Sequence, residues 1–230
     1  MPRGRYSTLR GRAVSARNSS ATFHRVLRYP WRMRPAGDTQ LIQIMDAALA
    51  DASRRAGTWL ACRPGCTQCC HGAFAINALD AGRLQAGMQT LREEDPARAA
   101  EVVKRAAMWI EEYGAEFPGE VGTGVLGTSD QEQSRFEGFA NEAPCPALNP
   151  ATGLCDVYAW RPMTCRVFGP PVRMGDGDAL GCCELCFVGA SEEEIAACEM
   201  MMPHELEEHL VAEVGDAGET VVAFGLVLEP

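Results

Sequence analysis

Four cysteines lie within nine residues of this sequence, in the segment CRPGCTQCC: Cys62, Cys66, Cys69 and Cys70. Gaps of two or three residues allow one loop to direct several thiolates at a common point, and Gly65 allows the backbone to turn sharply. Thiolates about 2.3 Å from a metal form zinc and iron–sulfur centres, so the segment predicts a metal centre. The adjacent Cys69 and Cys70 are not expected to reach one tetrahedral centre together. We expect one of them to ligate while the other packs, bridges or serves a second centre.

The remaining cysteines form later sets. The second set is Cys145, Cys155 and Cys165, the third is Cys182, Cys183 and Cys186, and Cys198 stands alone. Nine residues separate neighbouring members of the second set, and the turn residues between them allow the three side chains to converge. The pair Cys183-x-x-Cys186 is not in the strand-to-helix context of a thiol–disulfide enzyme. Cys198, in the segment IAACEMMM, is predicted to be a buried structural thiol within a helix.

The second set belongs to a longer motif. The motif is Cys145-Pro146-x-Leu148, then Cys155-x-Val157-Tyr158-x-x-Arg161-Pro162-x-x-Cys165-Arg166. With CRPGCTQCC in front of it, the chain resembles the YkgJ-type CxxCxxCC family over residues 58–170, a family described as zinc- or iron-chelating. It departs from the family in the first gap of the first motif, which is one residue longer here. Some relatives carry the domain fused to flagellin lysine methylation activity, so the resemblance implies a metal or iron–sulfur domain and no single reaction.

The resemblance implies a set of metal ligands drawn from both motifs. Its members are Cys62, Cys66, Cys69, Cys70, Cys145, Cys155 and Cys165. Four thiolates saturate one zinc ion or one [4Fe–4S] cluster, so a single zinc ion cannot use all of these cysteines. A [4Fe–4S] cluster with spare thiols, which we favour over zinc, fits the number of thiols, and so does a pair of smaller sites. The third cysteine set and His71 stay open as additional ligands, although a lone histidine beside a cysteine cluster is more often a neighbour.

Two arginines flank Cys165 in the longer motif. A four-thiolate site carries a formal charge of roughly −2, which is costly to bury unpaired. Arg161 and Arg166 are therefore expected either to offset that charge and donate hydrogen bonds to the sulfurs, or to form surface salt bridges. Tyr158 is expected to pack over the site, and Pro162 is expected to begin a short helical turn.

Three classes of function are compatible with these motifs. The first is a metal-binding protein with a structural, redox or metal-handling role. The second is a structural zinc module that binds another, unidentified protein. The third and least favoured is a radical S-adenosylmethionine enzyme, because Gln68 precedes the last cysteine of C-x3-C-x2-C, where an aromatic residue is usual. Catalysis is not expected, and an enzyme built on these motifs would be an iron–sulfur-dependent oxidoreductase or related to methylation.

The charge of the chain is unevenly distributed. The 230 residues carry a net charge of −10, yet residues 1–34 contain nine Arg and no acidic residue. We interpret 1–34 as a disordered leader, with the true start at Met33, rather than as an arm for nucleic acid. The remaining residues hold 12 Lys and Arg against 31 Asp and Glu, so the body is not expected to bind nucleic acid. Neither a secretory signal nor a membrane-spanning run is visible, so we expect a cytoplasmic protein, in which clustered cysteines commonly bind metals.

The elements that position these cysteines are predicted to be mainly helical. Helices are expected over 39–58, 79–93, 96–115 and 191–214. Asp38 is the expected N-cap of the first, and Ser191 with Glu194 forms a capping box for the last. The other elements are a loop over 116–135, a small hairpin over 145–158 and a short strand over 219–228. Residues 35–230 are thus expected to form one small, irregular α+β domain, mainly helical and organised around a cysteine-rich metal site.

Overall fold

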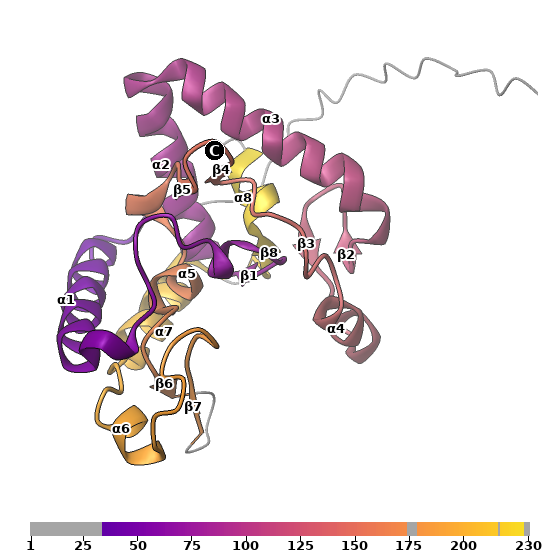
Figure 1. The fold of residues 1–230 in the computed structure, drawn as a ribbon. Coiled ribbons are helices and arrows are strands. Elements are labelled where there is room, and N and C mark those ends of the chain that lie inside the picture. Colours follow the sequence, from indigo (N-terminus) through magenta and orange to yellow (C-terminus); the bar gives the residue numbers. More distant parts are fainter. Residues whose placement is uncertain (1–33, 174–178, 216, 228–230) are drawn as a thin grey trace, which may run out of the picture.

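The computed structural model describes residues 34–173, 179–215 and 217–227 (Figure 1). The leader predicted over 1–34 and the start predicted at Met33 lie outside these residues, apart from Arg34. The expectation of a mainly helical α+β fold is confirmed. The helices are α1 (Asp38–Ala56), α2 (Ala78–Glu94), α3 (Pro96–Tyr113), α4 (Asp130–Glu137), α5 (Met163–Val167), α6 (Glu192–Ala196), α7 (His204–Val214) and α8 (Val222–Val227). Short 3-10 turns are η1 (Gly57–Trp59), η2 (Gln68–Cys70), η3 (Gly114–Glu116) and η4 (Tyr158–Trp160).

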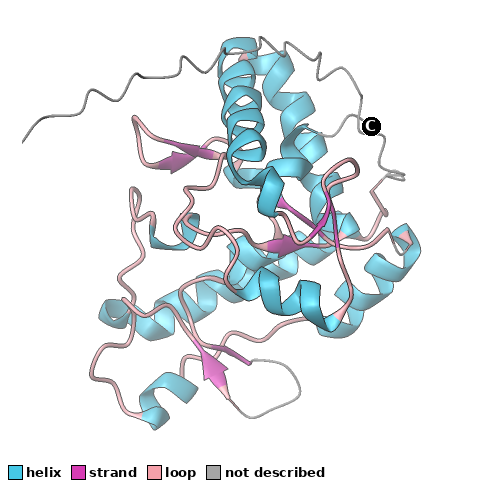
Figure 2. Cartoon of the chain, turned by 90° about the vertical axis from the view of Figure 1, so that its right-hand side faces the viewer, coloured by secondary structure: helices cyan, strands magenta, loops and turns pink. Residues whose placement is uncertain are grey.

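The β structure of the described residues consists of antiparallel pairs of two-residue strands. The pairs are β1 (Ala75–Ile76) with β8 (Thr220–Val221), β2 (Gly119–Glu120) with β3 (Val125–Leu126), β4 (Leu148–Asn149) with β5 (Leu154–Cys155), and β6 (Val172–Arg173) with β7 (Leu180–Gly181). Figure 2 shows them as short arrows between the helices. The strands therefore fix local turns, while the helices build the core. The hairpin predicted over 145–158 is confirmed as β4–β5.

Helices α2 and α3 follow one another with a single residue between them, and α8 packs against both. The side chain of Asp95 accepts a hydrogen bond from the backbone N–H of Arg98, and Pro96 occupies the first turn of α3. Asp95 therefore caps α3 immediately after α2 ends, which fixes the sharp change of direction. These two helices confirm the predictions over 79–93 and 96–115.

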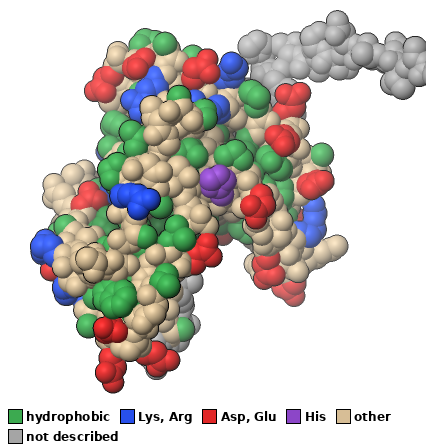
Figure 3. Space-filling model, in the orientation of Figure 1, with side chains coloured by type: hydrophobic (Ala, Val, Ile, Leu, Met, Phe, Trp, Pro, Cys, Tyr) green, Lys and Arg blue, Asp and Glu red, His purple; other side chains and the backbone are tan. Residues whose placement is uncertain are grey.

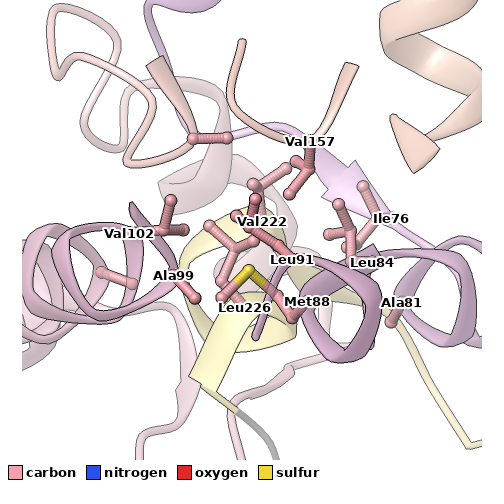
Figure 4. Close-up of a cluster of buried hydrophobic side chains, with 12 residues drawn as sticks. Ile76, Ala81, Leu84, Met88, Leu91, Ala99, Val102, Val157, Val222 and Leu226 are labelled. Carbon is pink, nitrogen blue, oxygen red and sulfur yellow. The ribbon is translucent and has the colours of Figure 1, made fainter. Parts of the chain in front are cut away.

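The largest buried cluster lies where α2, α3 and α8 meet (Figure 4). Its members are Ile76, Ala81, Leu84, Met88, Leu91, Ala99, Val102, Ala106, Ala147, Val157, Val222 and Leu226. Cys145 and Cys155, from the β4–β5 hairpin, pack against this cluster. Two cysteines of the second set are therefore attached directly to the hydrophobic core.

The segment predicted to be a strand over 219–228 is a strand only at its start. Thr220 and Val221 form β8, and the chain then turns into α8, so the prediction is wrong for the described residues that follow. Phe224 and Leu226 are completely buried there. A continuous apolar run fits a buried strand and a buried helix equally well, and packing against α2 and α3 favours the helix.

A second buried cluster joins α1, α5 and α7. Helix α1 confirms the prediction over 39–58, but Gly37 rather than Asp38 is its N-cap. Asp38 lies in the first helical turn and is buried, with its carboxylate 2.6 Å from the guanidinium of Arg83. A partner on α2 thus replaces the capping role that the sequence predicted for this carboxylate.

The last predicted helix, over 191–214, is interrupted. The capping box of Ser191 and Glu194 is present and begins α6, but α7 starts only after Pro203. Between them the backbone N–H of Met200 donates to the carbonyl of Pro171 over 2.8 Å instead of to a helical partner. Cys198 is buried, as predicted, but it lies in this turn and not within a helix.

The segment predicted to be a loop over 116–135 contains regular structure. It holds the β2–β3 hairpin and most of α4, which begins with a capping box of Ser129 and Glu132. The glycine, serine and acidic residues that suggested a loop serve here as turn and cap residues. The loop prediction is therefore wrong at both places.

Among the described residues, no helix is both long and apolar enough to cross a membrane. Acidic side chains gather at the lower and right-hand ends of the face shown in Figure 3. These ends correspond to α6 and α4, whose first turns are rich in Asp and Glu.

Candidate metal centre

The first cysteine motif occupies the connection between α1 and β1, which runs as two consecutive turns. In the first turn the backbone N–H of Cys66 donates to the carbonyl of Arg63 over 2.9 Å, and Gly65 has a φ of +86°. In the second turn, η2, the N–H of Cys70 donates to the carbonyl of Thr67 over 2.8 Å. The motif therefore changes direction between its first two and its last two cysteines.

All eleven cysteines are free thiols, and nine of them form two groups, within which the thiols shift one another's pKa. We name these groups by position. The inner group is Cys69, Cys70, Cys145, Cys155 and Cys165. The outer group is Cys62, Cys66, Cys183 and Cys186. The structure thus brings together most of the predicted set, but it places Cys62 and Cys66 with the third cysteine set instead.

Three segments of the chain meet at the inner group, and η2 is far from the other two in the sequence. The backbone N–H of Cys145 donates to the carbonyl of Cys70 over 2.8 Å, which joins the β4–β5 hairpin to η2. Cys155 lies on β5 opposite Leu148. Cys165 comes from α5, and Pro162 is the N-cap of that helix, so the helical turn predicted at Pro162 is confirmed.

A buried carboxylate holds the hairpin against α3. Asp156 lies 2.6 Å from Arg98 and 2.6 Å from Arg105, both on α3. Arg105 also donates to the carbonyl of Pro146 over 2.9 Å. We call Asp156, Arg98 and Arg105 the hairpin clamp. Because Asp156 directly follows Cys155, and Pro146 directly follows Cys145, the clamp fixes the backbone beside both thiols.

A second buried network holds α5. The carboxylate of Asp80, on α2, accepts the backbone N–H of Met163 over 2.8 Å and pairs with Arg83. Burial raises the pKa of Asp80, and the charge of Arg83 opposes that rise. The first turn of α5 is therefore tied to α2, two residues before Cys165.

The thiols of the inner group lie in a setting that disfavours isolated thiolates. Burial is the main cause that raises the pKa of Cys145, to about 12, and it also raises the pKa of Cys155 and Cys165. Cys69 and Cys70 behave as a pair: a hydrogen bond from Cys70 lowers the pKa of Cys69, and the same contact raises the pKa of Cys70. Several thiolates at this place require a compensating cation.

Arg161 is the arginine of the motif that faces these sulfurs. Its charge lowers the pKa of Cys69 and Cys155. Its side chain is buried, its guanidinium lies 3.9 Å from the ring centroid of Tyr158, and its Nε has no hydrogen-bond partner among the described residues. Tyr158 is 63% exposed and covers Arg161, so it reaches the site through that arginine.

Arg166 has a different role. Its guanidinium lies 2.7 Å from Asp46 on α1, and it donates to the carbonyls of Arg161, over 3.2 Å, and of Ala159. Burial lowers the pKa of Arg166, with the charge of Asp46 opposing this. Arg166 is buried and Asp46 is exposed, so the ion pair lies at the surface edge and joins α5 to α1, while the two carbonyl contacts join Arg166 to η4.

The outer group is held by two turns and a small apolar cluster. The sulfurs of Cys62 and Cys186 are 3.9 Å apart. Burial and then the charges of Cys186, Cys183 and Cys66 raise the pKa of Cys62 to about 12. Cys182 is exposed, and its pKa is raised first by partial burial and then by the charge of Cys186.

Histidines have peripheral positions. His71 is exposed, and its Nδ1 lies 3.1 Å from the carbonyl of Thr67. His204 and His209 are exposed on α7, as expected. The hairpin clamp was not predicted, although Asp156 lies inside the second motif. No short-range pattern connects it with Arg98 and Arg105, which are 58 and 51 residues away.

Comparison with known proteins shows which family the chain belongs to. A family model matches residues 61–176 and carries the description "CxxCxxCC: Putative zinc- or iron-chelating domain". The chain belongs to this family. The match covers half of the chain and includes the whole inner group, whereas Cys183 and Cys186 lie beyond it. No curated protein and no solved structure matches the chain.

The donor set of the CxxCxxCC domain suits thiophilic metals, because every member of both groups is a cysteine. In the described part of the chain, no three His, Cys, Asp or Glu side chains already surround one point closely enough to hold an ion. The backbone and the ion pairs therefore bring the sulfurs into the same neighbourhood, and a metal would draw the side chains together. Arg161, with its unpartnered buried Nε, supplies a cation where thiolate charge would accumulate.

Proposed function

We propose that this protein holds a [4Fe–4S] cluster at the inner group, with a redox role, and that four of the five thiols ligate it. Membership of a zinc- or iron-chelating family supports metal binding of some kind. The observation that favours a four-thiolate centre is Arg161, whose charge acts on Cys69 and Cys155 and whose buried Nε has no hydrogen-bond partner among the described residues. A four-thiolate site has a formal charge of roughly −2, and a buried guanidinium with an unpaired Nε fits such an anion.

The ligands of this proposal are Cys69, Cys145, Cys155 and Cys165. Cys70 is left as the fifth thiol, because two adjacent cysteines do not readily reach one centre. Its hydrogen bond to Cys69 suits a donor to a ligating sulfur. When bound, the cluster would supply one-electron transfer. Arg98, Arg105 and Arg161 offset its charge, and the packing of Cys145 and Cys155 against the core limits access of water.

The arrangement favours this function over radical S-adenosylmethionine chemistry. That chemistry needs the three cysteines of C-x3-C-x2-C on one cluster, here Cys62, Cys66 and Cys69. Cys62 instead lies with Cys186, Cys183 and Cys66. Cys69 lies with Cys70 and Arg161. Because the motif is divided between two groups, its three cysteines do not form the set of three ligands that would leave one iron of a cluster open.

The test is anaerobic purification of the full chain, with a visible absorption spectrum and with iron, sulfide and zinc measured per chain. We expect a brown protein with about four iron and four sulfide. The spectrum should bleach on addition of dithionite and recover with an oxidant, as a redox centre requires. A colourless protein with zinc and without sulfide would overturn the proposal, and the inner group would then be a closed zinc site of a module that binds a partner protein.

A further inference from the structure

The outer group combines two pairs of cysteines that the sequence separates by more than a hundred residues. We propose that Cys62, Cys66, Cys183 and Cys186 form a second, closed four-thiolate site for zinc, separate from the inner group. Two of its members come from the first motif, and two lie beyond the residues that the family model matches. The inference does not depend on what the inner group binds.

The distance between two of the sulfurs fits a shared metal. The Sγ atoms of Cys62 and Cys186 are 3.9 Å apart. A tetrahedral centre with bonds of about 2.3 Å holds its sulfurs roughly 3.8 Å apart. A disulfide would need about 2.05 Å, and the pair is well beyond that length. The two thiols are therefore already at the spacing of ligands on one zinc ion.

Cys183 and Cys186 are the two ends of one tight turn, and Cys66 ends another that begins directly after Cys62. The backbone N–H of Cys66 donates to the carbonyl of Arg63 over 2.9 Å, and that of Cys186 donates to Cys183 over 2.8 Å. The C-x3-C and C-x2-C spacings of the two pairs are those of zinc-ligand pairs. The backbone N–H of Ala61 points at the sulfur of Cys186 over 3.4 Å, which is how peptide groups stabilise ligating thiolates.

Contacts on both sides hold the two turns together. The backbone N–H of Phe187 donates to the carbonyl of Trp59 over 2.9 Å, and their rings are stacked with centroids 6.4 Å apart. Gln68 donates to Glu184 over 2.6 Å, which links the first motif to the Cys183 turn a second time. These contacts do not involve sulfur, so they hold the two segments that carry the four cysteines together without help from a metal.

Close packing shapes the site around Cys62. Gly169 has a φ of +121°, and a Cβ on it would lie 2.9 Å from the sulfur of Cys62. The carbonyl of Gly169 also accepts the backbone N–H of Cys183 over 3.3 Å. One glycine therefore contacts both cysteine pairs, and a larger residue there would push the Cys62 thiol away.

Zinc suits this site better than a cluster. Four thiolates on the two turns would repel one another, and a divalent ion supplies the compensating charge that they need. Cys62 is exposed, so solvent can reach this side of the group. Zinc has no redox chemistry of its own and tolerates such exposure in structural sites.

The first experiment measures zinc per chain after purification of the full chain under reducing conditions with added Zn²⁺. We expect Cys183→Ser and Cys62→Ser to hold about one zinc fewer than the unmodified chain. Two controls should keep that zinc: Cys182→Ser, the exposed neighbour of Cys183, and Cys198→Ala, a buried thiol of the same apolar cluster. Equal zinc in Cys183→Ser and in the unmodified chain would overturn the inference, as would a Cys62–Cys186 disulfide in a zinc-free chain.

A second measurement avoids variants that fold poorly. The unmodified chain is treated with iodoacetamide, and the extent of alkylation is mapped at each cysteine by mass spectrometry. A shared zinc ion should protect all four cysteines as a set, and removal of zinc by a chelator should expose them together, while Cys182 reacts throughout. If the four cysteines were alkylated at four independent rates, and if Cys62 reacted as fast as Cys182, the idea of a shared ion would be contradicted. If the purified chain held no iron while these four cysteines stayed protected, the result would count against the proposed function and not against this zinc site.

Discussion

The inner and outer groups use the same side chain but are assembled by different means. Buried ion pairs hold the inner group: the hairpin clamp on one side and Asp80 with Arg83 on the other. The outer group depends on two short turns and a few aromatic and backbone contacts. A guanidinium acts on the inner thiols, whereas the charges that act on Cys62 are those of other thiols. The comparison indicates an inner site held by charge pairs and an outer site held by short turns, and in both a metal would draw the sulfurs together.

The largest expected effect follows from removing a ligand of the inner group. Cys165→Ser should lose the iron and become sensitive to protease, because metal binding there joins α5, the hairpin and η2. We expect the melting temperature to fall by about 10 °C or more, the result of losing several kcal/mol in a chain of this size. Iron content, thermal melting and limited proteolysis measure these effects.

Cys70→Ser is the matched control for that experiment. It removes the fifth thiol of the inner group and should keep the iron. If Cys165→Ser retained full iron and an unchanged melting curve, the coupling of metal binding to folding at the inner group would lose its main support.

The next largest effect is expected from breaking the hairpin clamp, which holds the inner group and, among the described residues, does not contact the turns of the outer group. Asp156→Asn leaves Arg98 and Arg105 without their shared carboxylate, of which 1% is exposed. Breaking a buried pair costs about 3–5 kcal/mol, and the partial exposure of both arginines reduces this to about 2 kcal/mol. We expect less iron at the inner group and unchanged zinc at the outer group.

Glu101→Gln provides the control for the clamp, because it breaks an exposed ion pair with Lys104 on the same helix. It should change the unfolding free energy by less than about 1 kcal/mol. Iron and zinc lost in parallel from Asp156→Asn would show that the two groups are not independent.

The sequence predicted the local features of this molecule better than the long-range ones. The three long N-terminal helices, the hairpin over 145–158 and the turn at Pro162 follow from periodicity, turn residues and proline, which act over a few residues. The division of CRPGCTQCC between two groups does not, because it depends on which distant turn each half meets. The interruption of 191–214 and the helix at α8 likewise depend on packing against Pro171 and against α2 and α3. The motif predicts seven of the thiols as ligands, and which sulfurs lie in the same group depends on the fold.

A smaller effect tests the packing that places Arg161. A Cβ on Gly87 of α2 would lie 2.7 Å from the side chain of Trp160, the residue before Arg161. Gly87→Ala should therefore displace η4 and lower the unfolding free energy by about 1–3 kcal/mol, the usual range for overpacking. Chemical denaturation measures this loss, and the visible spectrum reports any change at the inner group.

Gly82→Ala, five residues earlier on the same helix, is the control for Gly87→Ala. Its Cβ would meet only the side chain of Arg34, at 3.8 Å. It should raise the unfolding free energy by about 0.5–1 kcal/mol through helix propensity. A Gly87→Ala chain as stable as Gly82→Ala would mean that η4 does not need its close contact with α2.

The smallest effect addresses the electrostatic difference between the groups. Reduction adds a negative charge to a cluster, and a nearby cation stabilises the reduced form. Arg161→Gln removes that cation, so the reduction potential should fall by about 60 mV, a tenfold change in a one-electron equilibrium. Arg161→Lys keeps the charge and should stay close to the original potential, while the zinc of the outer group should be unaffected in both variants. If the Gln and Lys variants shifted the potential equally, the cause would be packing around Tyr158, and the charge of Arg161 would no longer distinguish the inner group from the outer one.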